Sequence, residues 1–446
     1  MKKSVTHKLE NFIKKDPDPL LEHIGDAKYV LLGEASHGTS EFYMWRAEIT
    51  KRLVTEKGFS FIAVEGDWPD CYRVNRYAKG MENSGSSAYE VLHAFSRWPT
   101  WMWANREIVD LIEWLRSHNK GVENPDMKVG FYGLDVYSLW ESLDVVMQYL
   151  HKNYPGAMKS AIKAYRCFEP YGRDVEEYAK ATAFIPESCE DEVANMLIEL
   201  RGKAGGEDDD DNDGRFKADG REAHFNAEQN AVVARNAELY YRTMMHGGAA
   251  SWNVRDHHMM NTLERLMKLH GSDAKSIVWA HNTHIGDARA TDMRQAKMVN
   301  LGQLAREQAG HDNVVLVGLG TYKGSVIASK EWGKPMERMS VPPAIDGSWD
   351  SFLHHLDNNN VGQNKLLTFA DIDKIEASSS FLEPKGQRAI GVVYNPSYEK
   401  YGNYVETILP IRYDAFLFID ETRALHPLHM PVSPDEELPE TFPTGL

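Results

Sequence analysis

The sequence predicts an α/β fold, with a mostly parallel central sheet flanked by helices and a large all-helical insertion lobe. Short apolar runs that end in glycine or polar residues recur along the chain, and such runs are typical of strands buried on both faces of a parallel sheet. Amphipathic helical patterns lie between these runs. The long stretch 137–270 has helical periodicity and little sign of a strand.

Each element follows from a local pattern. We predict strands at the apolar runs 29–32, 61–64, 129–132, 276–280, 314–317, 389–394 and 415–419. Helices are predicted at 41–57, 101–118 and 137–151, where apolar residues recur at helical spacing. A further helix through 269 is expected to begin at Ser251, a favoured N-cap residue. The Pro-rich tail from His426 is expected to be extended.

The organisation that fits these elements is one core with an insertion. Residues 1–136 and 271–446 would form the α/β core, and 137–270 the helical lobe with an acidic loop at 205–220. The run 207–213 is almost entirely acidic, so its like charges favour a solvated loop. It lacks the spaced ligands and distal Glu of a calcium loop.

Composition excludes several classes of protein. The net charge of −16, without a basic stripe, disfavours nucleic acid and anionic membrane surfaces as partners. The sequence has no long apolar run of the kind that predicts a membrane span or a leader, so a cytoplasmic protein is expected. Three cysteines without a CxxC pair make a disulfide framework or zinc ribbon improbable. The absence of coiled-coil heptads leaves the oligomeric state unpredicted.

Titratable residues follow four of the predicted strands in succession, and they are Glu34 and His37, then Glu65, then Asp135, then His281 and His284. Ligands of open α/β sheets bind at the carboxyl ends of the strands. If the strands are parallel, these residues therefore meet at one cleft. The alternatives are local: loop residues at the surface, or helix caps in the case of Asp67 and Asp135.

Arg46 lies at the edge of an apolar helical stripe formed by Phe42, Trp45, Ile49 and Leu53. A guanidinium there keeps its charge and seeks a carboxylate, for which Glu34 and Glu65 are the candidates. The alternative is an arginine that reaches past the sheet edge into solvent.

The residue types indicate water activation. The sequence has no nucleophile elbow, P-loop or dinucleotide fingerprint. His and Glu without a Ser or Cys nucleophile favour direct hydrolysis, in which a neutral His takes a proton from water and a second His or an Arg stabilises an oxyanion. We expect no cofactor. The alternative is a divalent metal such as zinc or manganese, held by Glu34, His37, Glu65, His281 and His284.

Substrate-binding candidates are less specific. Arg255 and His258 are three residues apart on a predicted helix, so they share a face and could enter the cleft. The alternative for Arg255 is a surface ion pair with Asp256 or a neighbouring acid. Trp101, with Trp98 and Trp103, could stack on a substrate or belong to the core. Asp135 completes the candidate set.

Seven segments spread over nearly the whole chain carry a combined pattern, and they are LLGEASHGTSEFYMWRAEITKRL (31–53), FIAVEGDWPDCYRVNRY (61–77), WPTWMW (98–103), FYGLDVYSLW (131–140), SWNVRDHHM (251–259), WAHNTHIGDARA (279–290) and RAIGVVY (388–394). In these segments the sequence resembles the erythromycin esterase family, some of whose members are labelled succinoglycan biosynthesis proteins. The resemblance implies an α/β core, a large helical lobe and a cleft between them.

The resemblance also implies roles for single residues. The family's general base falls on His37 and the Glu of its G-E-x-x-H-G motif on Glu34. Its arginine falls on Arg46, its second Glu on Glu65, and its H-N-x-H histidines on His281 and His284. Founding members open the lactone ring of 14-membered macrolides, which implies antibiotic resistance through hydrolysis of a small-molecule ester or lactone. The alternatives are a metal-dependent hydrolase at the same cluster, or a non-catalytic small-molecule binding protein.

Overall fold

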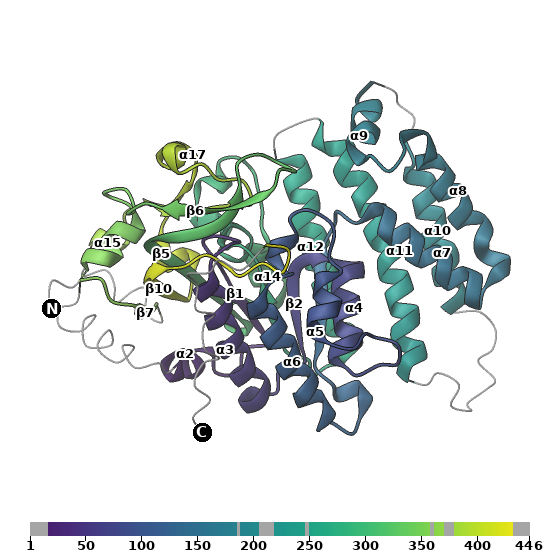
Figure 1. The fold of residues 1–446 in the computed structure, drawn as a ribbon, viewed down its shortest axis with the longest axis horizontal. Coiled ribbons are helices and arrows are strands. Elements are labelled where there is room, and N and C mark those ends of the chain that lie inside the picture. The colour runs from purple at the N-terminus through teal and green to yellow at the C-terminus, as the bar shows by residue number, and fades with distance from the viewer. Residues whose placement is uncertain are drawn as a thin grey trace.

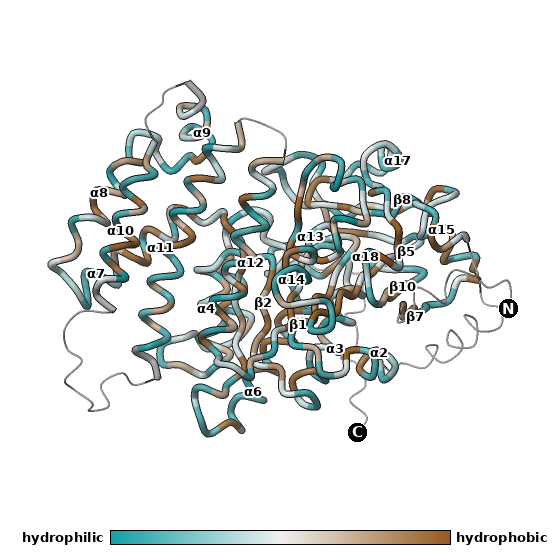
Figure 2. The backbone as a smooth tube through the Cα atoms, turned by 180° about the vertical axis from the view of Figure 1, so that it is seen from behind, coloured by the Kyte–Doolittle hydropathy of each residue, from teal (hydrophilic) through white to brown (hydrophobic). Residues whose placement is uncertain are grey.

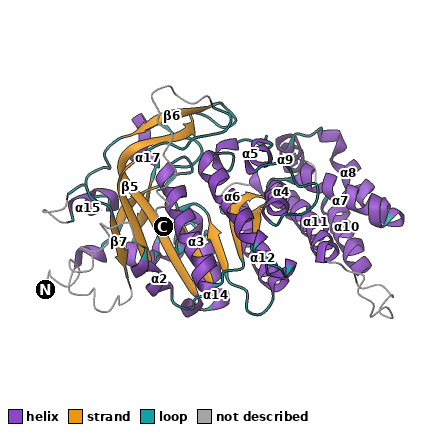
Figure 3. Cartoon of the chain, turned by 60° about the horizontal axis from the view of Figure 1, so that its bottom comes forward, coloured by secondary structure: helices purple, strands orange, loops and turns teal. Residues whose placement is uncertain are grey.

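The computed structural model describes residues 17–184, 188–204, 218–245, 249–356, 361–369 and 379–430. Its described strands form one mostly parallel eight-stranded sheet and a separate two-stranded sheet. Helices lie on both sides of the large sheet, and a group of helices stands at one end of the molecule (Figures 1 and 3). The predicted fold class is confirmed.

The order of the strands differs from their order in the sequence. It runs β3 (Gly130–Asp135), β2 (Phe61–Asp67), β4 (Ser276–Trp279), β1 (Tyr29–Leu32), β5 (Val314–Ser329), β10 (Ala415–Thr422) and β7 (Lys365–Thr368). Neighbours from β3 to β10 are parallel. Two strands pair antiparallel: β7 with β10, and β6 (Met336–Val341) with β5. The small sheet pairs β8 (Lys385–Arg388) with β9 (Tyr404–Thr407).

Alternate residues of the central strands enter different cores. On β1, Val30 and Leu32 pack in one apolar cluster, whereas Leu31 packs in the cluster on the other face. On β4, Ile277 and Trp279 belong to the first cluster and Val278 to the second. Both faces of the sheet are therefore covered, which explains why the strands are continuous apolar runs in the sequence and in Figure 2.

Helices flank the sheet. Those of the first part of the chain are α2 (Asp18–Ile24), α3 (Ser40–Lys57), α4 (Trp68–Ala78), α5 (Ala88–His93) and α6 (Arg106–Lys120). Those of the second part are α12 (Ala250–His270), α13 (Asn282–Ile285), α14 (Leu301–Ala309), α15 (Trp349–His355), α17 (Glu399–Gly402) and α18 (Leu409–Arg412). Within this described part of the chain, no helix is long and apolar enough to cross a membrane.

Three predictions about single elements are wrong, two about where a helix begins and one about a strand. The helix predicted from residue 101 begins at Arg106, because the Asn105 side chain caps it by accepting the Ile108 N–H, and Trp101 lies in a short 3₁₀ turn before it. Residues 389–394 form no strand, since Ile390 pairs with Ser36 and Val393 with Ser329, on two different partners. Ser251 is inside helix α12, which begins one residue earlier.

The helical group comprises α7 (Leu139–Asn153), α8 (Met158–Phe168), α9 (Val175–Phe184), α10 (Glu190–Ala204) and α11 (Ala218–Met244) (Figure 1). Its apolar core is a cluster of its own that runs from Val136 to Tyr241. Apolar residues of α12, such as Leu263, instead pack in the cluster on the sheet. The domain boundaries at 137 and 270 stay a prediction, and the acidic run 207–213 lies outside the described residues.

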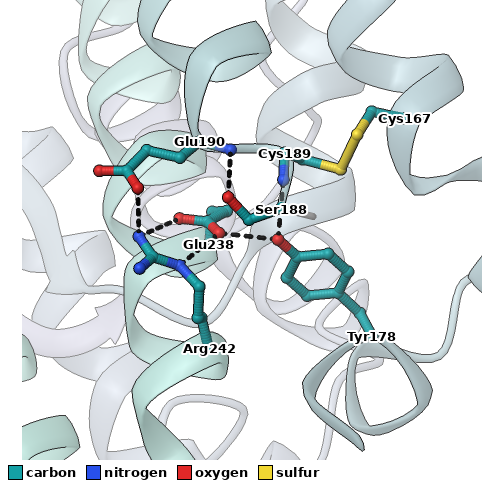
Figure 4. The surroundings of a disulfide bond; sticks show 7 residues. All are labelled: Cys167, Tyr178, Ser188, Cys189, Glu190, Glu238 and Arg242. Carbon is teal, nitrogen blue, oxygen red and sulfur yellow. Dashed lines mark hydrogen bonds and ion pairs between the residues drawn. A yellow bond between two sulfur atoms is a disulfide. The ribbon is translucent and has the colours of Figure 1, made fainter. Parts of the chain in front are cut away.

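A disulfide joins Cys167 to Cys189, a single bond that the sequence analysis did not predict. The bond links the end of α8 to the start of α10 (Figure 4). Beside it, Tyr178 accepts the backbone N–H of Cys189 and donates to Glu238, which is paired with Arg242. The cytoplasmic location stays a prediction.

Reduction of this disulfide is expected to lower the free energy of unfolding by about 3 kcal/mol, the chain-entropy value for a loop of this length. The loop spans 22 residues of the chain. Urea unfolding with and without a phosphine reductant measures the change. A Cys167→Ser/Cys189→Ser double variant is the control. Its free energy of unfolding should equal that of the reduced protein and should not change when the reductant is added. Equal stability of the oxidised and reduced wild type would contradict the expectation.

Candidate active site

Four adjacent strands end in a row at the same edge of the sheet. Gly133, Val64, Trp279 and Leu32 are aligned across β3, β2, β4 and β1. The predicted site residues follow this row by one or two positions, and they are Asp135, Glu65, His281 and Glu34. All four are buried. Strands that are scattered along the sequence therefore bring these side chains to one place.

Two glycines allow the loop after β1 to pack closely against neighbouring segments. A Cβ on Gly33 would lie 2.1 Å from the side-chain oxygen of Asn282, and a Cβ on Gly38 would lie 1.8 Å from the carbonyl oxygen of Ile327. Only glycine permits such close approach. The loop that carries Glu34 and His37 is thereby fixed between α13 and β5.

His37, Glu34 and Arg46 form a chain of hydrogen bonds. His37 Nδ1 lies 2.9 Å from Glu34 Oε1, and Arg46 Nη2 donates to Glu34 Oε2. Because an ionised carboxylate only accepts, Nδ1 carries the proton of the neutral ring. No described residue forms a hydrogen bond with Nε2 of His37, so its lone pair is available.

Arg46 is completely buried, and the prediction that it pairs with a carboxylate is confirmed. Its guanidinium lies over the rings of Tyr43 and Trp279, 4.4 and 4.6 Å from their centroids. These cation–π contacts hold the cation from α3 against the sheet. Arg46 therefore orients Glu34 through the carboxylate oxygen that His37 does not contact.

A second ionic group is built around Arg255, from α12. Its Nη2 donates to Glu65 Oε1 and to Asp135 Oδ2, each at 2.7 Å, and its Nε donates to Asp135 Oδ1 at 2.9 Å. Glu65 Oε2 accepts the backbone N–H of His281 at 2.7 Å. Arg255 thus connects strand ends β2 and β3 to α12, and it forms no pair with Asp256.

His281 caps helix α13 and faces His37. Its Nδ1 accepts the backbone N–H of Thr283 at 3.3 Å and lies 2.8 Å from the Thr283 hydroxyl, which can donate to it as well, so the proton of the neutral ring sits on Nε2. The Nε2 atom is buried and forms no hydrogen bond of normal geometry with a described residue, although the backbone of Ala35 lies close enough to the ring to favour its protonation. The centroids of the His37 and His281 rings are 4.9 Å apart. This N–H donor therefore lies beside the free lone pair of His37.

His284 uses both ring nitrogens. Nδ1 lies 2.9 and 3.0 Å from the two carboxylate oxygens of Asp256, and Nε2 lies 2.8 Å from Arg255 Nη1. The Trp252 ring is stacked on the imidazole, with centroids 4.5 Å apart and planes at 7°. His284 is thus fully engaged and connects the site to α12.

The pKa values of the two facing histidines, His37 and His281, shift in opposite directions. Burial opposes protonation of His37, but the negative charges of Glu65 and Glu34 outweigh it and raise the pKa of His37 above its usual value. For His281, burial and the neighbouring His37 lower the pKa well below that value. Burial alone would raise the pKa of Glu65, but His284 and His37, when they are protonated, and the permanent charge of Arg255 outweigh it and lower that pKa. His281 is therefore neutral and Glu65 ionised near neutral pH.

Asp67 is not a side-chain cap, although it occupies the N-cap position of α4. Its carboxylate pairs with Arg97 at 2.7 Å. Burial raises the pKa of Asp67 to about 7. The guanidinium of Arg97 lies over the ring of Tyr137, as does that of Arg255. Asp135 likewise forms an ion pair rather than a helix cap.

Two predicted substrate-binding residues lie beside the network rather than in it. Trp101 is 1% exposed and packs edge-on against Trp98. His258 is 2% exposed and bonded to Asn236, and burial lowers its pKa to about 4. We therefore assign neither Trp101 nor His258 a direct contact with the substrate.

The sequence analysis missed Asp256 and Trp252. With Arg255 they occupy positions i, i+3 and i+4 of one helix, and these positions lie on one face. That spacing was the available signal. It did not show that the face would dock at the ends of β3 and β4.

Three of the five side chains in the predicted metal ligand set have their donor atoms engaged with other partners, and they are Glu34, Glu65 and His284. Both oxygens of Glu65, both oxygens of Glu34 and both nitrogens of His284 take part in hydrogen bonds. Throughout the described ranges, no group of three or more His, Cys, Asp or Glu side chains has an arrangement that could hold a metal ion. The residues therefore do not fit the predicted alternative of a metal ligand set.

Comparison with known proteins gives consistent findings. The family model described as "Erythromycin esterase" matches residues 54–422, a range that begins after Glu34, His37 and Arg46. A protein of Escherichia coli named "Erythromycin esterase type II" is 22% identical over 324 residues, which cover 70% of this chain and 73% of that protein.

Solved structures share the fold. The crystal structure of a succinoglycan biosynthesis protein has a TM-score of 0.72 at 22% identity, with 95% of this chain and 97% of that chain covered. The structure of an erythromycin esterase variant in its open conformation has a TM-score of 0.64 at 16% identity, with 91% and 93% covered. At these identities the likeness establishes the architecture.

Proposed function

The chain belongs to the erythromycin esterase family, and from this premise we propose that it hydrolyses a small-molecule ester or lactone with water activated by His37. One observation carries the proposal: Glu34 holds Nδ1–H of a buried His37 whose Nε2 has no described partner. A neutral imidazole fixed in this way can accept a proton from water. Neither an activated Ser nor an activated Cys is needed.

The proposed reaction has two steps. Water attacks the ester carbonyl carbon while its proton passes to Nε2 of His37, and the oxyanion formed accepts the Nε2–H of His281. Glu34 and Glu65 stabilise the His37 imidazolium by their charges. The intermediate then collapses, the bond to the alkoxy oxygen breaks, and His37 returns the proton to that oxygen. An ester gives one acid and one alcohol, and a lactone gives a single hydroxy acid, with no covalent enzyme intermediate and no metal.

A macrolide lactone is the first substrate class that we propose, because relatives are named for erythromycin esterase activity. A panel of macrolides, simple lactones and aryl esters tests the proposal, with release of acid as the readout. We expect turnover of at least one compound, unchanged by a chelator. Loss of turnover with the chelator, restored by zinc or manganese, would contradict the metal-free mechanism. Tight binding with every compound recovered unchanged would contradict hydrolysis.

The pH dependence of kcat/KM is expected to show an acid limb with an apparent pKa above 6.5. Only neutral His37 accepts a proton, so activity rises with pH through the raised pKa of His37. A Glu34→Gln variant removes one of the negative charges that raise this pKa. The limb of its residual activity should therefore move to lower pH, as a pH series of initial rates will show.

A Glu238→Gln variant is the matched control for this shift. Glu238 is 1% exposed and ion-paired like Glu34, but it lies in the helical group beside the disulfide. Its acid limb should stay in place. An unshifted limb in Glu34→Gln would remove His37 as the titrating base.

A further inference from the structure

The tautomer of His284 follows from the partners of its two nitrogens. Arg255 only donates hydrogen bonds, so Nε2 of His284 must accept from Arg255 Nη1 at 2.8 Å. The single ring proton is therefore on Nδ1, where the two oxygens of Asp256 lie at 2.9 and 3.0 Å. His284 in this state is neither a base with a free lone pair nor a metal ligand.

The opposite tautomer has a partner within reach. Glu65 Oε1 lies 3.4 Å from Nε2 of His284, so a proton on Nε2 could bond to that carboxylate. That proton would also face the Nη1–H of Arg255, and two donors repel each other. Arg255 therefore disfavours a proton on Nε2, and Asp256 is the acceptor that favours it on Nδ1.

Asp256 is itself fixed. It is completely buried, and its Oδ1 accepts the backbone N–H of Leu301 at the start of α14 at 2.9 Å. The stacked Trp252 sets the plane of the imidazole, and its own Nε1 donates to the carbonyl of Val299. The carboxylate and the ring therefore have little freedom to exchange partners.

The count of donors on Arg255 shows what this arrangement accomplishes. A guanidinium has five N–H groups. On Arg255, Nε–H and both Nη2–H groups are taken by Asp135 and Glu65, and one Nη1–H is taken by His284. The other Nη1–H has no partner in the described part of the chain. It is the one donor of Arg255 left for a ligand.

We propose that Asp256 is a positioning residue that holds His284 as an Nδ1–H tautomer, so that His284 fixes Arg255 with one Nη1–H free for the carbonyl oxygen of the substrate. This proposal rests on the proposed hydrolysis only in its last step. The tautomer and its dependence on Asp256 are properties of the resting protein. Arg255 then adds a second donor to that of His281.

Nitrogen NMR of histidine-labelled protein tests the tautomer without any substrate. The wild type should show a protonated Nδ1 and an unprotonated Nε2 on His284, assigned with a His284→Asn variant. Asp256→Asn keeps an acceptor oxygen and should keep that tautomer. Asp256→Leu has a similar size and no acceptor, so the proton should move to Nε2. A protonated Nε2 in the wild type, or an unchanged tautomer in Asp256→Leu, would overturn the proposal.

Kinetics test the consequence for Arg255. In Asp256→Leu, kcat should fall about 10²–10³-fold, as for the loss of one oxyanion donor, with KM within about twofold. Asp256→Asn should lose less than Asp256→Leu. Asp350→Leu is the matched control, because Asp350 is completely buried and bonded to the backbone N–H of Arg388, outside the site. Equal losses of kcat in the two leucine variants would overturn the assignment.

The two proposals fail in different ways. If no compound of the panel is hydrolysed, the proposed function is wrong, and the NMR result still decides the role of Asp256 in setting the tautomer. If hydrolysis is found but Asp256→Leu keeps full kcat with its tautomer changed, the site hydrolyses esters without help from Arg255, and this inference is wrong.

Discussion

Replacing His37 with alanine is expected to lower kcat/KM about 10²–10⁴-fold, the contribution of a general base. His37 is the one imidazole of the site whose Nε2 has neither a proton nor a described partner. His281 carries its proton on Nε2, and His284 is bonded through both nitrogens. No other described histidine of the site can take over the proton transfer. Initial rates on a substrate identified in the panel measure the effect.

A His270→Ala variant is the control for this loss. His270 lies at the other end of the strands, bonded to the Tyr132 hydroxyl and stacked on Phe61 at the start of β2. It should keep the wild-type rate, and added imidazole should restore part of the rate to His37→Ala only. Folded His37→Ala protein with more than about a tenth of the wild-type kcat/KM would remove His37 from the mechanism.

Replacing Arg46 with methionine is expected to lower the free energy of unfolding by about 3–5 kcal/mol. Arg46 is completely buried and Glu34 is 1% exposed, so the variant leaves a carboxylate buried without its cation. Methionine retains most of the apolar contact with Tyr43 and Trp279, which isolates the loss of charge. Urea unfolding measures the change.

A double-mutant cycle separates the pair from its surroundings. Glu34→Gln together with Arg46→Met removes both charges, so the double variant should be more stable than the sum of the single losses predicts. Additive losses would show that Arg46 and Glu34 are not coupled. A cost below about 1 kcal/mol for Arg46→Met would show that the pair is solvated.

The strands of the central sheet could be predicted because each is buried on both faces. Val30, Ile62 and Ile277 lie in one core while their neighbours lie in the other, which requires continuous apolar runs. The candidate site followed from the same runs, since parallel strands present their carboxyl ends at one edge. The order β3-β2-β4-β1 has no local signal, because it depends on how the connections cross the sheet.

The features missed by the sequence analysis depend on contacts between distant segments. Cys167 and Cys189 have no motif, and they meet only because α8 packs against α10. Strand β6 is largely exposed, so its residues form no apolar run. Asp256 acquires its role when α12 docks beside His284, and the spacing of Trp252, Arg255 and Asp256 indicates a shared face but not where that face docks.

The central claim is that water activated by His37 attacks the substrate directly. Rapid-quench kinetics on an ester from the panel, with intact-protein mass spectrometry at each time point, test this most directly. We predict that acid and alcohol appear at the same rate from the first turnover, with the protein mass unchanged. A burst of alcohol equal to the enzyme concentration, together with a protein heavier by the acyl group, would contradict the account.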